Sequence, residues 1–341
     1  MKAVRIHAAG DLRIDDIPTP EPGPGEVLVA LEWGGVCGSD LGYWRSGASG
    51  TSVLREPLVL GHEVAGTISA LGEGVEDLQV GRRVTVHPAT VVPGQELPEA
   101  IAGRTNLYPQ VRYFGSAAFV PHEDGGFCAA RVVRADQIRL LPETVSTRHG
   151  AVAEPLGVAL HAVHRSGGVD GLRVLVNGAG PIGSLVAAAA RHSGAAEVTV
   201  ADLAPSALEI ARRMGAHATV DVSAGQELPA DVDVTIEASG APAALAGVFA
   251  ATRRGGVVVQ VGNLPGGKVE AALGAVVTRE IDYRGSYRFV DEISDALTLM
   301  AQGLDVEPLL THTFPIDEAQ QAFEVAADRS TGSSKVMLEL S

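Results

Sequence analysis

A glycine-rich turn joins a short apolar run to an alanine-rich segment in the middle of the chain. Arg173–Asn177 is predicted to be a buried parallel strand, and Gly178, Gly180 and Gly183 follow it at G-x-G-x-x-G spacing. These glycines permit a tight turn, let the backbone approach a pyrophosphate and let the next helix pack closely on the strand. The helix N-terminus then faces the phosphates. The pattern predicts a doubly wound parallel sheet that binds a dinucleotide.

The strand that follows this helix ends in an acidic residue. Glu197–Ala201 is predicted to be a strand, and Asp202 comes directly after it. A carboxylate at this place accepts hydrogen bonds from ribose hydroxyls and repels a 2′-phosphate. No arginine directly follows Asp202, so the sequence favours NAD over NADP. The alternative interpretation is a helix-capping or loop aspartate with no role in cofactor binding.

The spacing of apolar runs divides the chain into two parts. Residues 1–147 carry short β runs separated by Gly and Pro, which predicts an irregular β-rich barrel. Residues 148–288 alternate strands and helices, which indicates parallel strands with right-handed crossovers. We expect a last strand, Val336–Leu340, to return to the first part. The fold class is therefore α/β, with one domain formed by residues 1–147 and 289–341 and a nucleotide-binding domain formed by residues 148–288.

Individual elements follow from the same patterns. We expect helices at 155–165, 181–191, 206–214, 292–302 and 316–327, and strands at 27–31, 63–68, 83–86, 233–237 and 257–261. The apolar strand 256–261 is a candidate for pairing with a second subunit if it lies at the end of its sheet, although a central strand has the same pattern.

Four residues of metal-binding type recur at wide spacing. Cys37, His62, Glu63 and Glu154 supply a thiolate, an imidazole and two carboxylates. Three mixed ligands with a fourth position open are typical of a catalytic zinc site, whereas a structural zinc needs four closed ligands. A thiolate and one carboxylate neutralise Zn²⁺, so we expect Glu63 and Glu154 to exchange the roles of ligand and neighbour. Alone, each residue has a simpler interpretation, such as a buried cysteine or a turn histidine.

Composition limits the classes of partner. The chain has 341 residues, 46% of them hydrophobic, enough for two cores. Its 26 Lys and Arg against 41 Asp and Glu give a net charge of −15, which opposes binding to nucleic acid or to an anionic membrane. Two cysteines cannot form a disulfide framework. With no apolar signal or spanning segment, we expect a cytoplasmic protein with small-molecule partners.

The order of the motifs resembles that of a known family. Cys37–Asp40, Gly61–Glu63, Gly81–Val84, Ala153–Leu156 and Gly178–Gly183 occur in the order found in zinc-dependent medium-chain dehydrogenases. The resemblance covers essentially the whole chain and implies a GroES-like catalytic domain followed by a Rossmann domain. Within the family the chain looks like the polyol branch. Arg112–Ser116 and Pro121–Phe127 resemble the L-idonate 5-dehydrogenases most closely.

The resemblance implies roles for individual residues. Ser39 would hydrogen-bond the reacting oxygen and start a proton relay, or else be a turn serine at a helix start. Tyr43 would contact substrate, or else only pack. Arg112 and Arg288 are candidates to bind a substrate carboxylate, with an ordinary surface or phosphate contact as the alternative. The complete set expected at the cofactor is Gly178, Gly180, Pro181, Ile182, Gly183, Asp202, Val261, Gly262, Asn263, Ser286, Tyr287 and Arg288.

The chain departs from the family at one place. Relatives carry four closely spaced cysteines that hold a structural zinc, and His87 through Gln110 contains none, with Tyr108 where the last would be expected. We therefore predict one catalytic zinc per subunit and no structural zinc. The lobe would be held by its prolines and apolar contacts, or be mobile.

Three functions remain open at this stage. The resemblance implies zinc- and NAD-dependent oxidation of a secondary alcohol in a sugar acid, L-idonate to 5-ketogluconate, in a reversible reaction. The first alternative is a neutral polyol such as sorbitol or xylitol as substrate. The second is a metal-free protein of the quinone-reductase type, or a nucleotide-binding protein. Relatives are homodimers or homotetramers, so self-association is expected.

Overall fold

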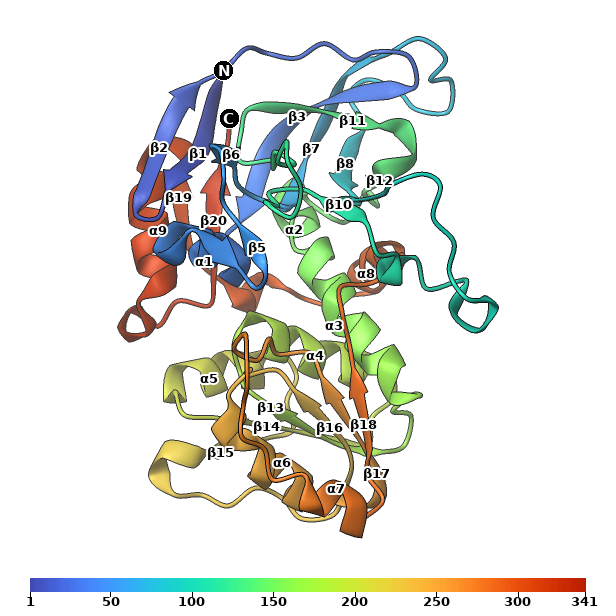
Figure 1. Ribbon diagram of the computed structural model, residues 1–341, viewed down its shortest axis with the longest axis vertical. Helices are drawn as coiled ribbons and strands as arrows, with labels where there is room; N and C mark the ends of the chain where they lie inside the picture. Colours follow the sequence, from blue (N-terminus) through green and yellow to red (C-terminus); the bar gives the residue numbers. More distant parts are fainter. The chain divides into compact units, whose positions relative to one another are not determined.

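The computed structural model describes residues 1–341, which form two compact units (Figure 1). Unit 1 consists of Met1–Glu154 and Leu310–Ser341, and unit 2 consists of Pro155–Leu309. The boundaries expected from the sequence were 147/148 and 288/289. The second boundary lies later in the chain because α8 (Glu292–Ala301) packs within unit 2, where Glu292 accepts a hydrogen bond from His161 at 2.7 Å. Both family-type folds expected above, a β-rich unit and a doubly wound unit, are present.

Unit 1 is built on a seven-stranded sheet in the order β12-β8-β7-β3-β20-β19, with β11 also paired to β3. The final strand β20 pairs antiparallel with β3, so that Met337 lies opposite Gly35, and the end of the chain returns to the first sheet as expected. The strands of this sheet are β3 (Glu26–Gly35), β7 (Glu63–Leu71), β8 (Arg83–Val86), β11 (Ala130–Arg134), β12 (Ile138–Leu140), β19 (Leu310–Pro315) and β20 (Lys335–Glu339).

Smaller elements surround this sheet. β1 pairs with both β2 and β6, β4 pairs with β5, and β9 pairs with β10. Their bounds are β1 (Lys2–Ala8), β2 (Asp11–Asp16), β4 (Ala48–Ser49), β5 (Ser52–Val53), β6 (Leu58–Val59), β9 (Ala89–Val91) and β10 (Val111–Tyr113). The helices of unit 1 are α1 (Gly38–Ser46), α2 (Thr147–Gly150) and α9 (Ala319–Ala327), and α3 (Ala153–Ser166) begins in unit 1.

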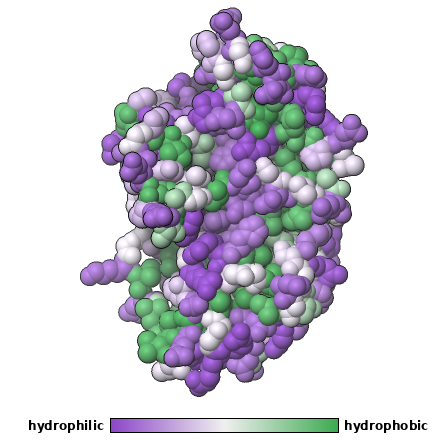
Figure 2. Space-filling view, turned by 90° about the vertical axis from the view of Figure 1, so that its right-hand side faces the viewer, coloured by the Kyte–Doolittle hydropathy of each residue, from purple (hydrophilic) through white to green (hydrophobic).

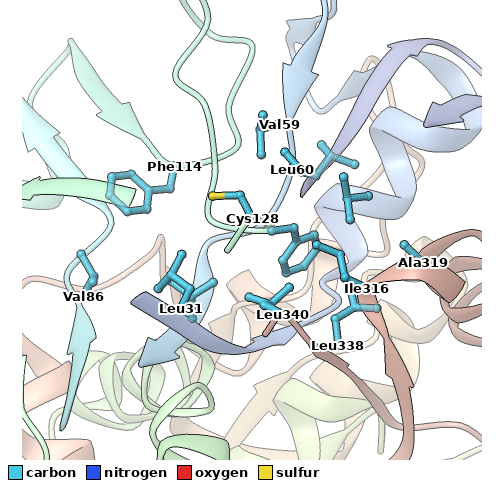
Figure 3. Packing of buried hydrophobic residues seen from close by; sticks show 14 of the residues in the cluster. Leu31, Val59, Leu60, Val86, Phe114, Cys128, Ile316, Ala319, Leu338 and Leu340 are labelled. Carbon is cyan, nitrogen blue, oxygen red and sulfur yellow. The ribbon is translucent and has the colours of Figure 1, made fainter. Parts of the chain in front are cut away.

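The core of unit 1 brings the glycine before His62 into close packing. Phe127 is fully buried and meets Phe323 edge to face, with ring centroids 6.4 Å apart. Leu31, Leu338, Leu340 and Cys128 belong to the same cluster (Figure 3). A Cβ on Gly61 would stand 2.3 Å from the Phe127 ring, and Gly61 has a φ of +96°, so only glycine fits there. The core therefore sets the backbone from which His62 projects.

Unit 2 is a six-stranded parallel sheet in the order β15-β14-β13-β16-β17-β18, the order of a dinucleotide-binding fold. Its strands are β13 (Arg173–Asn177), β14 (Glu197–Asp202), β15 (Ala218–Asp221), β16 (Val232–Glu237), β17 (Thr252–Gln260) and β18 (Asp282–Gly285). β17, the strand considered above for subunit pairing, has neighbours on both sides, and β18 is the edge.

The helices of unit 2 cross over between these strands. α4 packs on β13 and β14, α5 on β14 and β15, and α6 on β16 and β17 (Figure 1). They span α4 (Pro181–His192), α5 (Pro205–Arg213), α6 (Leu245–Ala251) and α7 (Gly274–Thr278). None of the helices of the chain combines the length and the apolar character needed to cross a membrane. Figure 2 shows a face on which hydrophilic residues predominate.

Candidate active site

The β3–β7 pairing brings three metal-binding side chains of unit 1 together. Glu63, the first residue of β7, lies opposite Gly35 of β3, and Cys37 follows Gly35 by two residues. Ligand atoms of Cys37, His62 and Glu63 all lie within 4.8 Å of one another. A Cβ on Gly35 would stand 2.3 Å from Glu63 Oε2, so this glycine leaves room for the carboxylate. Residues far apart in sequence thus form one cluster.

Asp40 holds the two loops of this cluster in place. Its Oδ2 accepts a hydrogen bond from the Cys37 backbone N–H at 2.9 Å, and its Oδ1 accepts one from Gly61 N–H at 3.2 Å. Oδ1 also lies 3.9 Å from His62 Nδ1. Burial raises the pKa of Asp40, while His62 and the backbone donors counter this only in part. This role of Asp40 was not predicted from the sequence, although an acidic residue three positions after Cys37 at a helix start is a usable signal.

Lys335 is a buried cation beside the cluster. Its Nζ donates to Glu63 Oε1 at 2.7 Å and to the carbonyl of Val36 at 3.2 Å, and the residue is 2% exposed. Burial lowers the pKa of Lys335, but the charges of Glu63 and Cys37 outweigh burial and raise it. No sequence signal pointed to Lys335, because it lies on β20, 272 residues after Glu63.

Glu154, at the start of α3, is held by a tyrosine. Tyr113 of β10 donates its hydroxyl to Glu154 Oε1 at 2.5 Å, and its ring meets His62 edge to face with centroids 5.7 Å apart. Burial and the neighbouring Glu63 raise the pKa of Glu154, against the opposing effect of His62. Glu154 therefore lies beside the cluster, but it is not among the three residues whose ligand atoms converge.

The residues present fit a zinc ion. Cys37, Asp40, Glu63 and Glu154 are four acidic groups in one place, and Lys335 is the buried cation that faces them. Glu63 Oε2 is buried, and its ion-pair partner is the Lys335 ammonium group at 2.7 Å. Burying excess negative charge is costly unless a cation compensates it. Thiolate, imidazole and carboxylate are the donor set that zinc takes at catalytic sites.

Other predicted substrate residues of unit 1 lie around the cluster. Ser39 is half-buried in the first turn of α1. The Tyr43 hydroxyl accepts a hydrogen bond from Ala117 N–H at 2.9 Å, and the residue is buried. Arg112 precedes Tyr113 on β10, so the two side chains point to opposite faces of the strand.

Arg112 makes its contacts away from the metal-binding side chains. Its Nη1 donates to the carbonyl of Pro121 at 3.2 Å and lies 3.5 Å from Glu123 Oε2, and its guanidinium stands over the Phe119 ring. Glu123 also pairs with Arg131 at 3.0 Å. Two arginines therefore share one carboxylate at this place.

Gln95 bridges the two ends of the 92–110 lobe, the segment where cysteines were expected from the family resemblance. Gln95 Nε2 donates to the carbonyls of Val92 and Gln110 at 2.7 and 2.8 Å, and its Oε1 accepts from Gln110 N–H at 2.8 Å. The β9–β10 ladder continues from this clasp, with Val91 opposite Val111. The prediction above named prolines and apolar contacts as the support of this lobe, whereas backbone pairing and one amide side chain close its base.

The glycine turn of unit 2 has the geometry of a dinucleotide site. Gly178 has a φ of +103°, and a Cβ on Gly183 would stand 1.8 Å from the Gly178 carbonyl oxygen. A Cβ on Gly180 would meet nothing within 4 Å, so space lies open above the turn. α4 starts with Pro181 at its first turn, and no side chain caps it. The turn therefore offers uncapped backbone donors to a phosphate.

Asp202 ends β14 and supports this turn. Its Oδ2 accepts from Ala179 N–H at 2.6 Å and its Oδ1 accepts from Ala204 N–H at 2.9 Å. Each oxygen has a second lone pair for a ribose hydroxyl. The remaining predicted cofactor residues follow β17 and β18 at the same sheet edge: Val261, Gly262, Asn263, Ser286, Tyr287 and Arg288.

Two of those residues have notable local geometry. Ser286 Oγ is buried and has no hydrogen-bond partner, an orphan donor at the edge where a nucleotide would lie. Arg288 has a φ of +52°, and its guanidinium stands 4.9 Å from the Tyr287 ring centroid. The orphan hydroxyl and the open space above Gly180 both fit a bound dinucleotide.

Both units of the chain are similar to known proteins. Residues 23–143 match the sequence model of the alcohol dehydrogenase GroES-like domain, and residues 181–302 match that of the zinc-binding dehydrogenases. Sorbitol dehydrogenase of Gallus gallus is 38% identical over an alignment of 348 residues, gaps included, and the alignment covers 99% of this chain and 96% of the relative.

Solved structures are similar over nearly the whole length. L-idonate 5-dehydrogenase from Escherichia coli has a TM-score of 0.91 and 33% identity, covering 99% of this chain and 97% of that one. A proposed zinc-binding dehydrogenase from Sinorhizobium meliloti bound to NADP has a TM-score of 0.89 and 32% identity, covering 99% and 98%.

Proposed function

Because the chain belongs to the zinc-dependent medium-chain alcohol and polyol dehydrogenases, we propose that it oxidises a secondary alcohol of a sugar acid, L-idonate to 5-ketogluconate, reversibly and with NAD. The observation that carries the dehydrogenase proposal is the convergence of Cys37, His62 and Glu63 in the β-rich unit. The uncapped glycine turn of the doubly wound unit supports the binding of a dinucleotide.

Cys37, His62 and Glu63 would hold one catalytic zinc per subunit, with Glu154 as the exchanging carboxylate. Zinc supplies a Lewis acid that lowers the pKa of the substrate hydroxyl, and NAD accepts the hydride. Asp40 holds the Cys37 and His62 loops through two backbone hydrogen bonds. Tyr113 keeps Glu154 oriented. Ser39, in the first turn of α1, would accept the substrate proton and pass it toward solvent.

The cofactor preference rests on Asp202. Its carboxylate carries negative charge to the end of β14, and Leu203 and Ala204 follow it in place of an arginine. A 2′-phosphate would meet repulsion there, so NAD is the proposed cofactor. Gly178, Gly180, Pro181, Ile182 and Gly183 would receive the pyrophosphate.

The identity of the acid rests on likeness to the Escherichia coli L-idonate enzyme. Arg112 and Arg288 are the proposed carboxylate receptors. A neutral polyol such as sorbitol is the second candidate, and one observation favours it: Arg112 already lies near Glu123 and over Phe119. An arginine so engaged gains less from a substrate carboxylate than an unpaired one.

The test is NADH formation from L-idonate, D-gluconate, sorbitol, xylitol and L-threonine, with protein of measured zinc content. We expect turnover of L-idonate with one zinc per chain. Arg112→Ala should then reduce kcat/KM for L-idonate far more than for sorbitol. Activity confined to neutral polyols would refute the sugar-acid proposal, and inactivity of zinc-loaded protein on all five would refute the dehydrogenase proposal.

A further inference from the structure

A fully buried glutamate lies beneath the carboxyl edge of the parallel sheet in unit 2. Glu237 is the last residue of β16 and has no exposed surface. β16 is the neighbour of β13, and the strand order reverses between these two (Figure 1). In open parallel sheets, ligands bind outside the carboxyl ends of the strands at this reversal. Glu237 therefore lies under the floor of the expected cofactor crevice.

The Glu237 side chain accepts hydrogen bonds from groups at the ends of three strands. Oε1 accepts from Asn177 Nδ2 at 3.1 Å, from Ser239 N–H at 2.8 Å and from Ser239 Oγ. Oε2 accepts from Gly240 N–H at 3.1 Å and from Gln260 Nε2. Asn177 ends β13 and Gln260 ends β17. One carboxyl group thus ties together the ends of β13, β16 and β17.

The loops tied in this way are the ones that would contact the dinucleotide. A Cβ on Gly178, the first glycine of the turn, would stand 2.7 Å from Ser239 N, so the turn rests on the loop that Glu237 holds. A Cβ on Gly262 would stand 2.4 Å from Gly240 N. Gln260 Nε2 also donates to the Gly262 carbonyl at 2.7 Å. Hydrogen bonds of Glu237 and Gln260 thus connect the two loops.

We propose that Glu237 is a positioning residue that sets the spacing between the pyrophosphate turn at Gly178 and the loop at Gly262–Asn263. It touches neither cofactor nor substrate and acts through Ser239, Gly240 and Gln260. This inference rests on the proposed NAD-dependent function. Glu237 would position the loops that bind the pyrophosphate and nicotinamide portions of the cofactor, whereas Asp202 would bind the adenosine portion.

The test compares nucleotide affinities in Glu237→Gln, which keeps the size of the side chain. In either orientation its amide NH₂ faces at least two donors that lose their acceptor. We expect the Kd for NADH, measured by fluorescence titration, to rise about tenfold or more, because misplaced contacts weaken with small displacements. The Kd for AMP, which lacks the nicotinamide half, should change less than about twofold on the same scale.

Two further variants keep the test independent of folding defects. Thr235 lies on the same strand as Glu237 but before its carboxyl end, and Thr235→Val removes its buried hydrogen bond to Thr252. This variant should lower the melting temperature without changing the Kd for NADH. If Glu237→Gln does not fold, Ser239→Ala removes a single donor and should weaken NADH binding by a smaller factor.

The outcomes separate this inference from the proposed function. An unchanged Kd for NADH in Glu237→Gln, or equal weakening of AMP and NADH, would overturn the positioning role while leaving the dehydrogenase proposal intact. Absence of NADH binding by the unaltered protein would instead overturn the proposed function, and the inference with it.

Discussion

The ammonium group of Lys335 lies 2.7 Å from both carboxylate oxygens of Glu63, and both residues are almost fully buried. Both oxygens therefore face this ammonium group, and a ligand atom of Glu63 also lies within 4.8 Å of those of Cys37 and His62. Lys335 and the candidate metal site thus share one carboxylate. Lys335 therefore compensates the charge of Glu63 in the metal-free protein and would orient this carboxylate toward the proposed zinc.

We expect Lys335→Met to destabilise the zinc-free protein more than the zinc-loaded one. Removing one partner of a buried ion pair costs about 3–5 kcal/mol, because the other charge is left uncompensated. Zinc would supply that compensation in the loaded form. Chemical unfolding with and without a chelator measures the difference, and Lys335→Arg is the control that keeps the charge. Equal losses in both forms would contradict this role.

Tyr113→Phe should lower stability and loosen Glu154 without disturbing the fold. The lost hydrogen bond to a carboxyl group is worth about 1.5–3 kcal/mol if that group is charged. Tyr43→Phe is the matched control, because its hydroxyl bonds only a neutral backbone donor, Ala117 N–H, and should cost about 1 kcal/mol. Urea unfolding of both variants gives the comparison. A larger loss in Tyr43→Phe than in Tyr113→Phe would refute the assignment.

Gln95→Ala should open the base of the 92–110 lobe locally. The variant loses three hydrogen bonds, each worth about 1 kcal/mol. We expect faster amide hydrogen exchange at Gln110 and easier proteolysis within the lobe, with the core of unit 1 unchanged. Gln79→Ala, a change at an exposed glutamine of the same unit, serves as control. Identical exchange in the two variants would show that the clasp contributes nothing.

The Glu292 cluster predicts a pH-dependent contribution to stability. Burial opposes ionisation of Glu292, but hydrogen bonds from His161 and His164 outweigh it and lower the pKa of this carboxyl from its ordinary 4.5. The hydrogen bond to Glu292 raises the pKa of His164 from 6.5. Because its pKa is lowered, the Glu292 carboxylate stabilises the fold above pH 4.5, and this contribution is lost as the pH falls through its folded pKa. Because its pKa is raised, the His164 imidazole stabilises the fold below pH 6.5, and this contribution is lost as the pH rises through its folded pKa.

The stability difference between the unaltered protein and Glu292→Gln should therefore be largest between pH 4.5 and 6.5. Unfolding midpoints across pH 3–8 measure it, with His164→Gln separating the upper limb from the lower. A difference that stays constant across this range would show that the cluster is not linked to protonation.

Several elements were predictable because local pattern and topology agree. The strand before Gly178 and the helix after it were expected at 173–177 and 181–191, and the structure has them at 173–177 and 181–192. A glycine turn between a buried strand and a helix permits few arrangements, and parallel strands with crossovers permit few strand orders. Cys37, His62 and Glu63 were identifiable because their side chains carry metal-binding chemistry that few other roles require.

Lys335, Tyr113, Gln95 and Glu237 were not identifiable in the same way. Lysine, tyrosine, glutamine and glutamate are common on protein surfaces, and nothing adjacent in sequence distinguishes these four. Their roles come from pairing across long separations, such as β20 with β3 and β16 with β13. Arg112 was predicted from the sequence as a substrate-binding residue, and its neighbour Tyr113 was not. It is Tyr113 that donates a hydrogen bond to Glu154.

The amino-acid sequence by itself determined the two-part architecture, the glycine turn and the identity of the candidate metal-binding side chains, because these depend on local backbone preference and side-chain chemistry. Tertiary structure alone decided which buried cation faces Glu63, which hydroxyl holds Glu154, and which carboxyl group joins the loops of the nucleotide crevice. Those partners are selected by the desolvation cost of burying a charge or donor, which exists only once the sheets have closed around it.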